Sequence, residues 1–342
     1  MTTKPVRCAL VGAGRIAQSY AQALAGCDEL RLAAVVDTCE EAARRLAAGF
    51  GCPAYASAAE LIAARPGLDA VLVCTPPDTH RDLSVRFVHR GWHVLCEKPF
   101  SLDVASARAM LRAAKQSGVL LTMASKFRFV ADVIRAREIV RSGPLGEVLL
   151  FENVFASRVD MAGRWNADPA VSGGGVLIDN GTHSVDLMRY FLGPVADVQA
   201  VEGKRVQRLP VEDTVRISVR SAAGVLGNID LSWSLNKEQD AYLTLHGSKG
   251  TLLVGWKESK YRLYSSPEWV VFGRGYDKVQ AFRSQLVNFA RAVRGEEALF
   301  LGAEDALASV QVVAAAYRSL RRSHWTAVPP RPRAAKVAVK ER

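Results

Sequence analysis

Residues 8–17, CALVGAGRIA, constrain the fold more than any other stretch of the chain. An apolar run typical of a buried strand leads into Gly12-Ala-Gly14-Arg15-Ile16-Ala17, and an amphipathic pattern typical of a helix follows. Gly12 permits a tight turn, Gly14 lets a pyrophosphate approach the backbone, and Ala17 keeps the helix close to the strand. The free N–H groups at the start of the helix favour a phosphate. The motif therefore predicts a dinucleotide-binding turn.

Asp37 ends the second expected strand, 20 residues after Ala17. A carboxylate there accepts hydrogen bonds from the adenosine ribose and repels a 2′-phosphate. The next residues, Thr38 and Cys39, supply no arginine that would compensate for the repulsion. The sequence thus predicts NAD as the cofactor and leaves NADP as the alternative, and a helix N-cap is a second interpretation of Asp37.

The rest of the first third repeats the alternation of short apolar runs and helical patterns. This rhythm is typical of βαβ units, so we expect an α/β fold that begins with a Rossmann domain, a doubly wound parallel sheet, over residues 1–124. The expected strands are residues 7–11, 32–36, 54–56, 70–74, 93–96 and 120–124.

Beyond residue 125 the pattern changes to long helices and alternating segments. We expect an α+β domain with a large, mostly antiparallel open sheet over residues 125–328, and a basic tail over 329–342. The expected helices are residues 131–142, 176–192, 281–293 and 304–321, and the expected strands are 147–155, 215–220, 225–234, 242–246, 251–255 and 261–264.

Length, charge and cysteine content narrow the class of protein. A chain of 342 residues favours two hydrophobic cores. The net charge is +11, but much of the excess lies beyond residue 317, where there are eight Lys or Arg and one acidic residue. The sequence contains no basic stripe with interleaved aromatic residues, so we do not expect it to bind nucleic acid. No apolar run approaches the length of a membrane span. All six cysteines precede residue 97 without a C-x-x-C pair, so we expect core thiols, no metal site and a cytoplasmic protein.

Polar residues follow the fourth and fifth expected strands. Thr75-Pro76-Pro77-Asp-Thr-His80 follows one, and Glu97-Lys98-Pro99 follows the other. The carboxyl ends of parallel strands form the ligand crevice of such a sheet. A lysine fixed there can direct its ammonium group at a reacting oxygen, and Lys98 is the only lysine that we expect in this place. A solvated surface lysine is the alternative interpretation.

A third motif, GGGVLIDNGTHSVD, spans residues 173–186. In a helix Asp179 and His183 are four residues apart and share a face with Asp186. An aspartate beside a histidine sets its tautomer and tunes its pKa for proton transfer. The alternatives are a histidine with a purely structural role and a metal site, for which a third ligand is missing.

Taken together, these motifs resemble the glucose-fructose oxidoreductase, inositol dehydrogenase and MocA family over residues 5–328. The resemblance rests on six segments in order: GAGRIA (12–17), TPPDTH (75–80), GWHVLCEKP (91–99), GPLGEV (143–148), GGGVLIDNGTHSVD (173–186) and AAYRS (315–319). It implies hydride transfer between a nicotinamide and a secondary alcohol or ketone of a sugar or cyclitol. It also implies a homodimer or homotetramer joined by the open sheet, and a cis bond before Pro99.

By matching positions, the resemblance makes Lys98, Asp179 and His183 the catalytic residues, which also contact the substrate. In this interpretation Asp179 orients His183, the proton acceptor, while Lys98 holds the reacting oxygen. The expected cofactor contacts are Gly12, Gly14, Arg15, Ile16, Ala17, Asp37, Thr75, Pro76, Pro77, His80, Glu97 and Lys98.

The expected further substrate contacts are Arg128, Arg164, Trp165 and Asn166. The order Arg164-Trp165 departs from the Trp-Arg order common in the family. Two other functions stay open: an NAD-dependent glycosidase or lyase that oxidises its substrate transiently, and a non-catalytic NAD-binding regulator. For the oligomer, we expect an uncovered sheet face that carries Leu231, Trp233 or Leu243.

Overall fold

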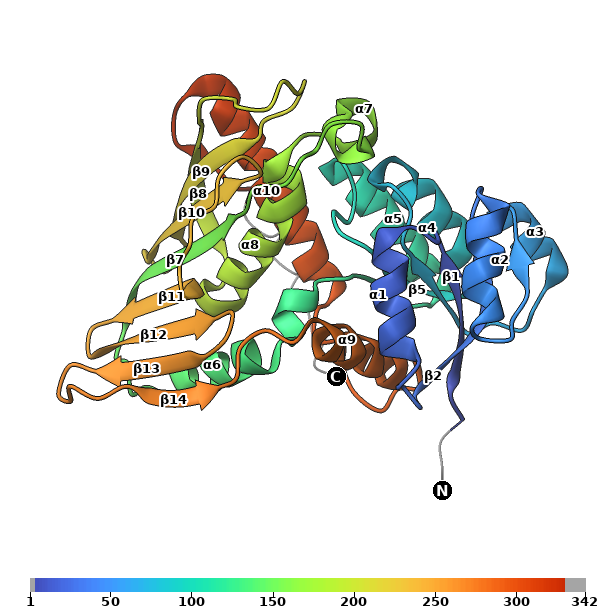
Figure 1. The fold of residues 1–342 in the computed structure, drawn as a ribbon, viewed down its shortest axis with the longest axis horizontal. Helices are drawn as coiled ribbons and strands as arrows, with labels where there is room; N and C mark the ends of the chain where they lie inside the picture. Colours follow the sequence, from blue (N-terminus) through green and yellow to red (C-terminus); the bar gives the residue numbers. More distant parts are fainter. Residues whose placement is uncertain (1–3, 330–342) are drawn as a thin grey trace, which may run out of the picture.

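The computed structural model describes residues 4–329, and its N-terminal part, which forms one of the two halves of the molecule in space, is built on a parallel sheet of six strands (Figure 1). The strand order β3-β2-β1-β4-β5-β6 reverses direction between β1 and β4, where doubly wound sheets bind their ligands. This order confirms the predicted Rossmann sheet. The strands are β1 (Val6–Val11), β2 (Leu30–Val36), β3 (Ala54–Tyr55), β4 (Ala70–Val73), β5 (His93–Cys96) and β6 (Leu121–Met123).

Helices cover both faces of this sheet, because its strands are apolar on both sides. One core forms between the strands and the helices α1 (Arg15–Leu24), α2 (Glu40–Ala48) and α9 (Lys278–Val293). The core on the other face contains α3 (Ala58–Ala64), α4 (His80–Val88), α5 (Val104–Ser117) and part of α10 (Ala303–Arg322).

The second half is built on a nine-stranded sheet in the order β14-β13-β12-β11-β7-β10-β9-β8-β15. All neighbours are antiparallel except β7 and β10, which run parallel. The mostly antiparallel sheet was predicted. Its strands are β7 (Val148–Ala156), β8 (Val195–Glu202), β9 (Thr214–Ser221), β10 (Leu226–Ser232), β11 (Ala241–Gly247), β12 (Gly250–Gly255), β13 (Ser259–Leu263), β14 (Val270–Gly273) and β15 (Thr326–Ala327).

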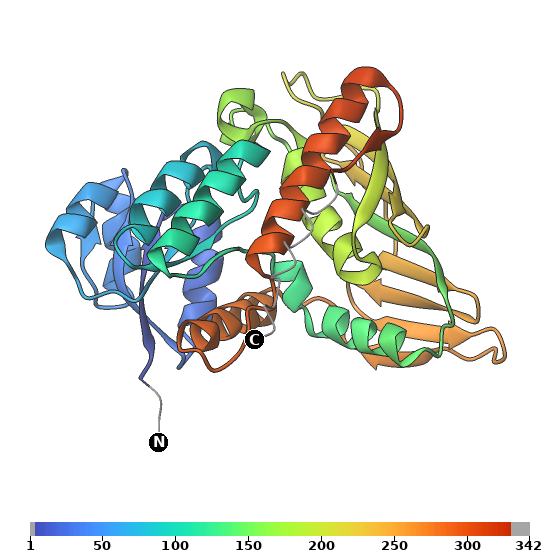
Figure 2. The same ribbon diagram turned by 180° about the vertical axis from the view of Figure 1, so that it is seen from behind.

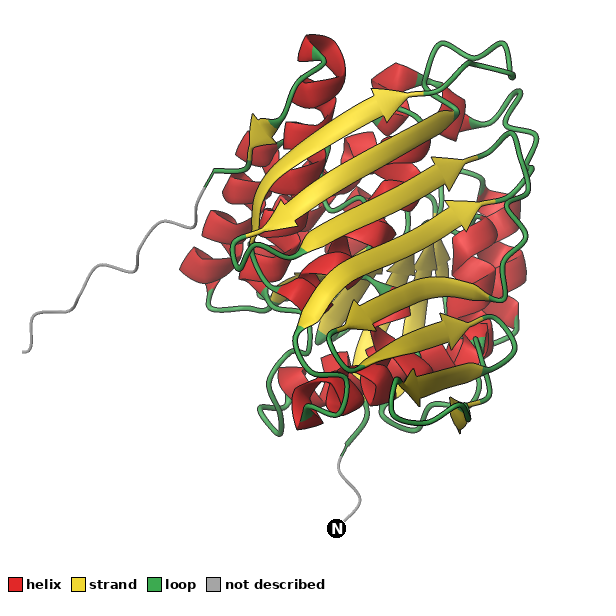
Figure 3. Ribbon diagram, turned by 90° about the vertical axis from the view of Figure 1, so that its left-hand side faces the viewer, coloured by secondary structure: helices red, strands yellow, loops and turns green. Residues whose placement is uncertain are grey.

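Within residues 4–329, helices cover one face of this second sheet and leave the other open. The covering helices are α6 (Ala131–Ser142), α8 (Val176–Leu192) and α10, and no helix lies in front of the opposite face in Figure 3. Leu231, Trp233 and Leu243 are buried beneath the helices, at 1%, 2% and 0% exposure. The expectation that these three side chains line the uncovered face is therefore wrong, because their strands turn them toward the helices.

The long helix α10 connects the two halves. Ala306 and Val310 belong to the core of the Rossmann sheet, whereas Val312 and Ala316 belong to the core of the second sheet. Figure 2 shows the helix running between the two sheets, with α9 returning to the Rossmann side. The two last helices, α9 and α10, therefore connect the two halves.

Some predicted features fall elsewhere in the structure. Short helices at η1 (Pro77–Thr79), η2 (Lys126–Phe129), η3 (Trp165–Ala167) and α7 (Pro169–Ser172), and the strands β8, β14 and β15, were not predicted. Cys39 is exposed, so it is not a core residue as expected. The predicted tail lies outside the described residues beyond residue 329. Within residues 4–329, no helix combines the length and apolarity that a bilayer crossing requires.

The turn after β1 requires glycine at position 12. Gly12 has φ +97°, and a Cβ atom there would lie 2.7 Å from the backbone carbonyl group of Cys74, the residue after β4. We predict that Gly12→Ala lowers stability by roughly 2 kcal/mol or more, from strain and overpacking. A Cβ at Gly14 would have no neighbour within 4 Å, so Gly14→Ala is the matched control. Thermal unfolding without NAD measures both, and equal Tm values would contradict the prediction.

Candidate active site

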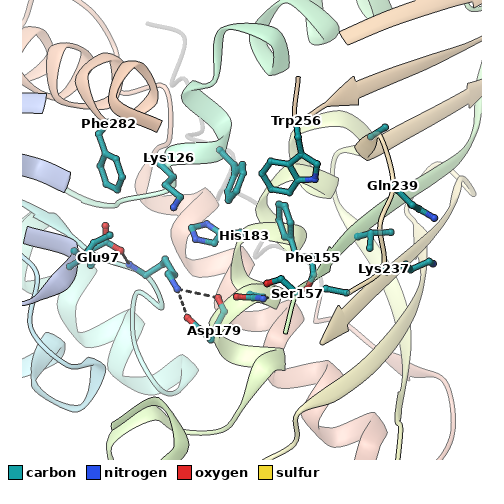
Figure 4. A pocket seen from close by; sticks show the side chains of 17 residues that line it. Glu97, Lys126, Phe155, Ser157, Asp179, His183, Lys237, Gln239, Trp256 and Phe282 are labelled. Carbon is teal, nitrogen blue, oxygen red and sulfur yellow. Dashed lines mark hydrogen bonds and ion pairs between the residues drawn. The ribbon is translucent and has the colours of Figure 1, made fainter. Parts of the chain in front are cut away.

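A cavity of about 330 Å³ lies between the two halves of the molecule, at the carboxyl ends of the Rossmann strands. Figure 4 shows Glu97, Lys126 and Phe282 on one side of it and Ser157, Lys237 and Gln239 on the other, with His183 and Trp256 between them. The first group comes from the strand ends of the Rossmann sheet and from α9, and the second from the end of β7 and the loop before β11. The cavity thus joins a cofactor side to a side formed by the second sheet.

Lys98 and Asp179 form an ion pair across this cleft. The Lys98 Nζ donates to Asp179 Oδ1 and to the Asp179 carbonyl oxygen, at 3.3 Å for the latter. These are the dashed contacts that meet Asp179 in Figure 4. Both side chains are about one-fifth exposed. The pair fixes the ammonium group of the first half against helix α8 of the second half, so the strand-end lysine is held inside the cavity.

His183 lines the same cavity but does not pair with Asp179. Its Nδ1 is buried without a hydrogen-bond partner among the described residues, and its ring packs edge-on against Phe127 at 5.0 Å. The expected orientation of His183 by Asp179 is therefore wrong, because the carboxylate is engaged by Lys98. Burial, then the charges of Lys98 and Lys126, hold the pKa of His183 well below its usual 6.5. The imidazole is neutral at pH 7 and able to accept a proton.

Lys126 is a second lysine in the cavity that the sequence prediction missed. It begins η2 just after β6, so it also follows a strand end of the Rossmann sheet, and Lys98 is not the only such lysine. Its Nζ lies over the rings of Phe127, Phe282 and Tyr276 at 5.3, 5.5 and 6.0 Å. Burial, followed by repulsion from Lys98, lowers its pKa to about 8. Its charge therefore acts on the same space as Lys98.

Two hydrogen-bonded groups fix the loop that carries Lys98. Glu97 is buried, which raises its pKa, and it accepts a 2.8 Å hydrogen bond from the Tyr20 hydroxyl and one from the Lys98 N–H. His80 is buried with its ring nitrogens 2.9 Å from the carbonyl oxygens of Pro99 and Thr75. The imidazole thus links the two strand-end loops. The Lys98–Pro99 bond is cis, as the resemblance implied.

The glycine turn provides a cradle for a dinucleotide phosphate. Helix α1 begins at Arg15, its N-cap Gly14 contributes no side-chain hydrogen bond, and the space beside Gly14 is open. Asp37 accepts from the Ala13 N–H at 2.6 Å and from the Cys39 N–H at 2.8 Å. The aspartate therefore shapes the turn, and its oxygens keep further lone pairs for ribose hydroxyls. The donor set fits an NAD-type cofactor.

Glu212 holds the start of the helix that carries Asp179 and His183. Its carboxylate accepts from the N–H groups of Gly175 and Leu177, at 2.9 and 3.2 Å, and from the Tyr317 hydroxyl at 2.7 Å. A Cβ at Gly175 would lie 2.0 Å from the Glu212 carbonyl oxygen, so only glycine fits there. A buried carboxylate thus caps α8 and connects it to α10.

Some of the expected contact residues line the cavity, and others lie outside it. Ile16, Glu97, Lys98, Asp179 and His183 line the cavity. Arg128 does not: it is buried in ion pairs with Asp186 and Asp305, which brace η2, α8 and α10. Arg164, Trp165 and Asn166 sit at η3 and are not among the cavity-lining residues.

Comparison with known proteins identifies the family. Residues 6–125 match the model described as "Oxidoreductase family, NAD-binding Rossmann fold", and residues 133–253 match the "GFO/IDH/MocA C-terminal domain". The chain is 30% identical over 323 residues to the rhizopine catabolism protein MocA of Rhizobium meliloti, covering 92% of this chain and 95% of that protein. This chain belongs to the GFO/IDH/MocA family.

A further relative and a solved structure are similar to this chain. Inositol 2-dehydrogenase of Rhizobium meliloti strain 1021 is 29% identical over 335 residues, covering 92% of this chain and 97% of that protein. The structure of a levoglucosan dehydrogenase in complex with NADH and levoglucosan superimposes with a TM-score of 0.87 at 20% identity, covering 95% of this chain and all of that one. As a GFO/IDH/MocA member, this chain is an oxidoreductase with an NAD-binding Rossmann domain.

The charge of Lys126 has a measurable effect on His183. Because the nearby cation disfavours a protonated imidazole, we predict that Lys126→Met raises the pKa of His183. The exposed Lys204, changed to Met, is the control. An NMR titration of the His183 ring, assigned with His183→Asn, measures the pKa in each variant. An unchanged pKa in Lys126→Met would contradict this electrostatic role.

Proposed function

We propose that the enzyme transfers hydride between NAD and a secondary alcohol or ketone of a sugar or cyclitol. The observation that carries this proposal is the convergence of Lys98, Asp179 and His183 in one cavity beside the dinucleotide turn. Relatives named inositol 2-dehydrogenase, D-glucoside 3-dehydrogenase and levoglucosan dehydrogenase support a polyhydroxylated substrate.

Each of the three residues takes one task in this proposal. NAD, when bound, supplies the hydride acceptor. Lys98 donates a hydrogen bond to the substrate hydroxyl oxygen and stabilises the negative charge that develops as its proton leaves. Neutral His183 accepts that proton. Asp179 keeps the Lys98 ammonium in place, and in the reducing direction His183 returns the proton to the carbonyl oxygen.

The neutral state of His183 suits this assignment. A base must be unprotonated to accept a proton, and burial together with two neighbouring ammonium groups favours that state. Lys98 and Lys126 also supply the positive field in which an alkoxide is stable. Proton transfer and charge stabilisation are thus assigned to different side chains.

The test is an assay of NADH formation with a panel of sugars and cyclitols, on the wild-type protein and on Lys98→Met. This substitution removes the charge and retains an unbranched apolar side chain. We predict that turnover falls about 100-fold or more, the scale of one lost preorganised electrostatic contact. NADH binding should stay within about threefold, because the glycine turn and Asp37 lie elsewhere.

Two outcomes would contradict the proposal. If Lys98→Met kept more than about a tenth of the wild-type rate, the lysine would not carry the assigned role. A glycosidase would release a sugar from a glycoside without net NADH formation, so absorbance and product are recorded together. Absence of any NADH formation across the panel would favour the glycosidase or the regulatory alternative.

We further propose that the protein is a homo-oligomer joined through the open face of the nine-stranded sheet. On that face the register aligns Leu226, which is 52% exposed, between Leu150 and Arg220. Carboxylates and guanidinium groups alternate nearby, as in the Arg216–Asp230 and Arg220–Asp197 pairs. A surface that combines positive charges, negative charges and apolar side chains can be complementary to the same surface of a second copy.

Sedimentation equilibrium at micromolar concentration tests this assembly. We predict a dimer or tetramer for the wild type and a shift to smaller species for Leu226→Glu, which would bury a charge in the contact. Val206→Glu changes an equally apolar, 68% exposed residue outside the sheet and is the control. A monomeric wild type would contradict the proposal.

We also propose that cofactor binding and substrate binding belong to separate parts of the chain. Residues 1–124 contain the glycine turn and Lys98, and residues 125–328 contain Asp179, His183 and the far wall of the cavity. We therefore propose that the first part binds NAD and the second part binds the substrate and the partner copy.

A further inference from the structure

Trp256 is exposed in an unusual place. It follows β12, is 41% exposed, and lines the active-site cavity together with Lys98, Asp179 and His183. A large aromatic side chain usually buries most of its surface, so an exposed one in a concave site indicates a contact surface. Figure 4 shows the ring beside Phe155, between His183 and the Lys237 side of the cavity.

The indole ring packs against other aromatic rings of the second sheet and its loops. Its centroid lies 4.6 Å from the ring of Tyr242, 5.6 Å from Tyr276 and 6.1 Å from Phe155. The backbone N–H of Trp256 donates to the Asp240 carbonyl oxygen at 3.1 Å, and the backbone N–H of Tyr276 donates to the Trp256 carbonyl oxygen at 3.0 Å. Packing and backbone hydrogen bonds therefore fix the ring before any ligand binds, which lowers the entropic cost of a contact.

Polar side chains line the same cavity as Trp256. Asn180, Ser157 and Gln239 line the cavity with Lys237. The Gln239 amide makes no hydrogen bond to any residue of the described range 4–329, so its donors and acceptor are free for a ligand. Lys237 pairs at 2.5 Å with Asp230, a carboxylate that also binds Arg216. This side of the cavity therefore combines an exposed aromatic ring with side chains that can form hydrogen bonds.

We propose that Trp256 is the stacking platform that makes the enzyme select ring-form substrates, either pyranoses or cyclitols, over open-chain polyols. A six-membered ring with equatorial hydroxyls has two faces of C–H groups, which are apolar, and a rim of hydroxyls. One face packs on the indole ring while the rim reaches Gln239 and Asn180. An open-chain polyol of the same composition has no such rigid face, and it loses more conformational entropy on binding.

This inference rests on the proposed function and adds a specificity-determining residue to it. Trp256 comes from the second sheet, away from the dinucleotide turn, so it should act on substrate binding and not on NAD binding. Its removal should therefore raise KM more than it lowers kcat, the behaviour of a contact present equally in ground and transition states.

The test compares Trp256→Ala, Trp256→Phe and a control, Trp325→Ala. Trp325 is 43% exposed, packs over Arg220 and lies outside the cavity. The ring probes are myo-inositol, scyllo-inositol, D-glucose and methyl β-D-glucoside, and the open-chain probe is D-glucitol. KM and kcat are measured for each at saturating NAD, with the NADH dissociation constant and Tm of every variant.

For the best ring probe we expect Trp256→Ala to raise KM about tenfold, the effect of about 1.4 kcal/mol of lost binding. The change in kcat and in NADH affinity should stay within about threefold. Trp256→Phe keeps a flat ring and should recover most of the lost affinity. The preference for ring probes over D-glucitol should shrink in Trp256→Ala and persist in Trp325→Ala.

An unchanged KM for ring probes in Trp256→Ala would overturn the inference, and so would equal losses for ring probes and D-glucitol. If Trp256→Ala is unstable, the test uses Trp256→Phe and Trp256→Leu, provided that both have the Tm of the wild type. Only the phenylalanine variant should then preserve the preference for ring probes. A wild-type protein that oxidises D-glucitol but no ring probe refutes ring selection alone. A wild-type protein that forms no NADH with any probe refutes the proposed function and this inference with it.

Discussion

The ion pair between Lys98 and Asp179 is the contact on which the active site depends, because it joins the two halves of the molecule at the reacting position. Lys98 is fixed by the strand end that precedes it, and Asp179 by a helix that is packed against the second sheet. A lysine side chain loses considerable conformational freedom when it is held in one position. The attraction of the Asp179 carboxylate offsets this entropic cost, so the Lys98 ammonium group points into the cavity before a substrate arrives.

The surrounding structure keeps the partners of that ion pair in register. The buried Glu212 caps the helix of Asp179 and binds Tyr317 of α10, whose own residues lie in the cores of both halves. On the other side, His80 and Glu97 hold the loop of Lys98. These three buried groups therefore help to position Lys98 and Asp179, in agreement with the need for preorganised charge in hydride transfer.

The sequence predicted the parts of the site that follow from local rules. Helical periodicity located α6 and α8 to the residue, and the topology of a parallel sheet brought Lys98 to the crevice. Strand β8 was missed because a bulge near Val195 interrupts its alternation. Asp179 pairs with Lys98, which is 81 residues away in the sequence, and not with His183 on its own helix. The spacing of residues within one helix does not reveal such a long-range contact. Trp256 and Gln239 reach the cavity from loops of the second sheet, and only long-range packing brings them there. Lys126, by contrast, follows a strand end and was open to the same reasoning as Lys98.

The most direct measurement is a double-mutant cycle on kcat with Lys98→Met, Asp179→Asn and the combined variant, at saturating NAD and the best substrate. If Asp179 acts by holding the Lys98 ammonium, the combined variant should be only as slow as Lys98→Met alone, within about threefold. Unchanged NADH affinity and Tm in all three proteins would assign the effect to the reacting position. Losses that multiply in the combined variant would show that the two residues act separately and would contradict the account.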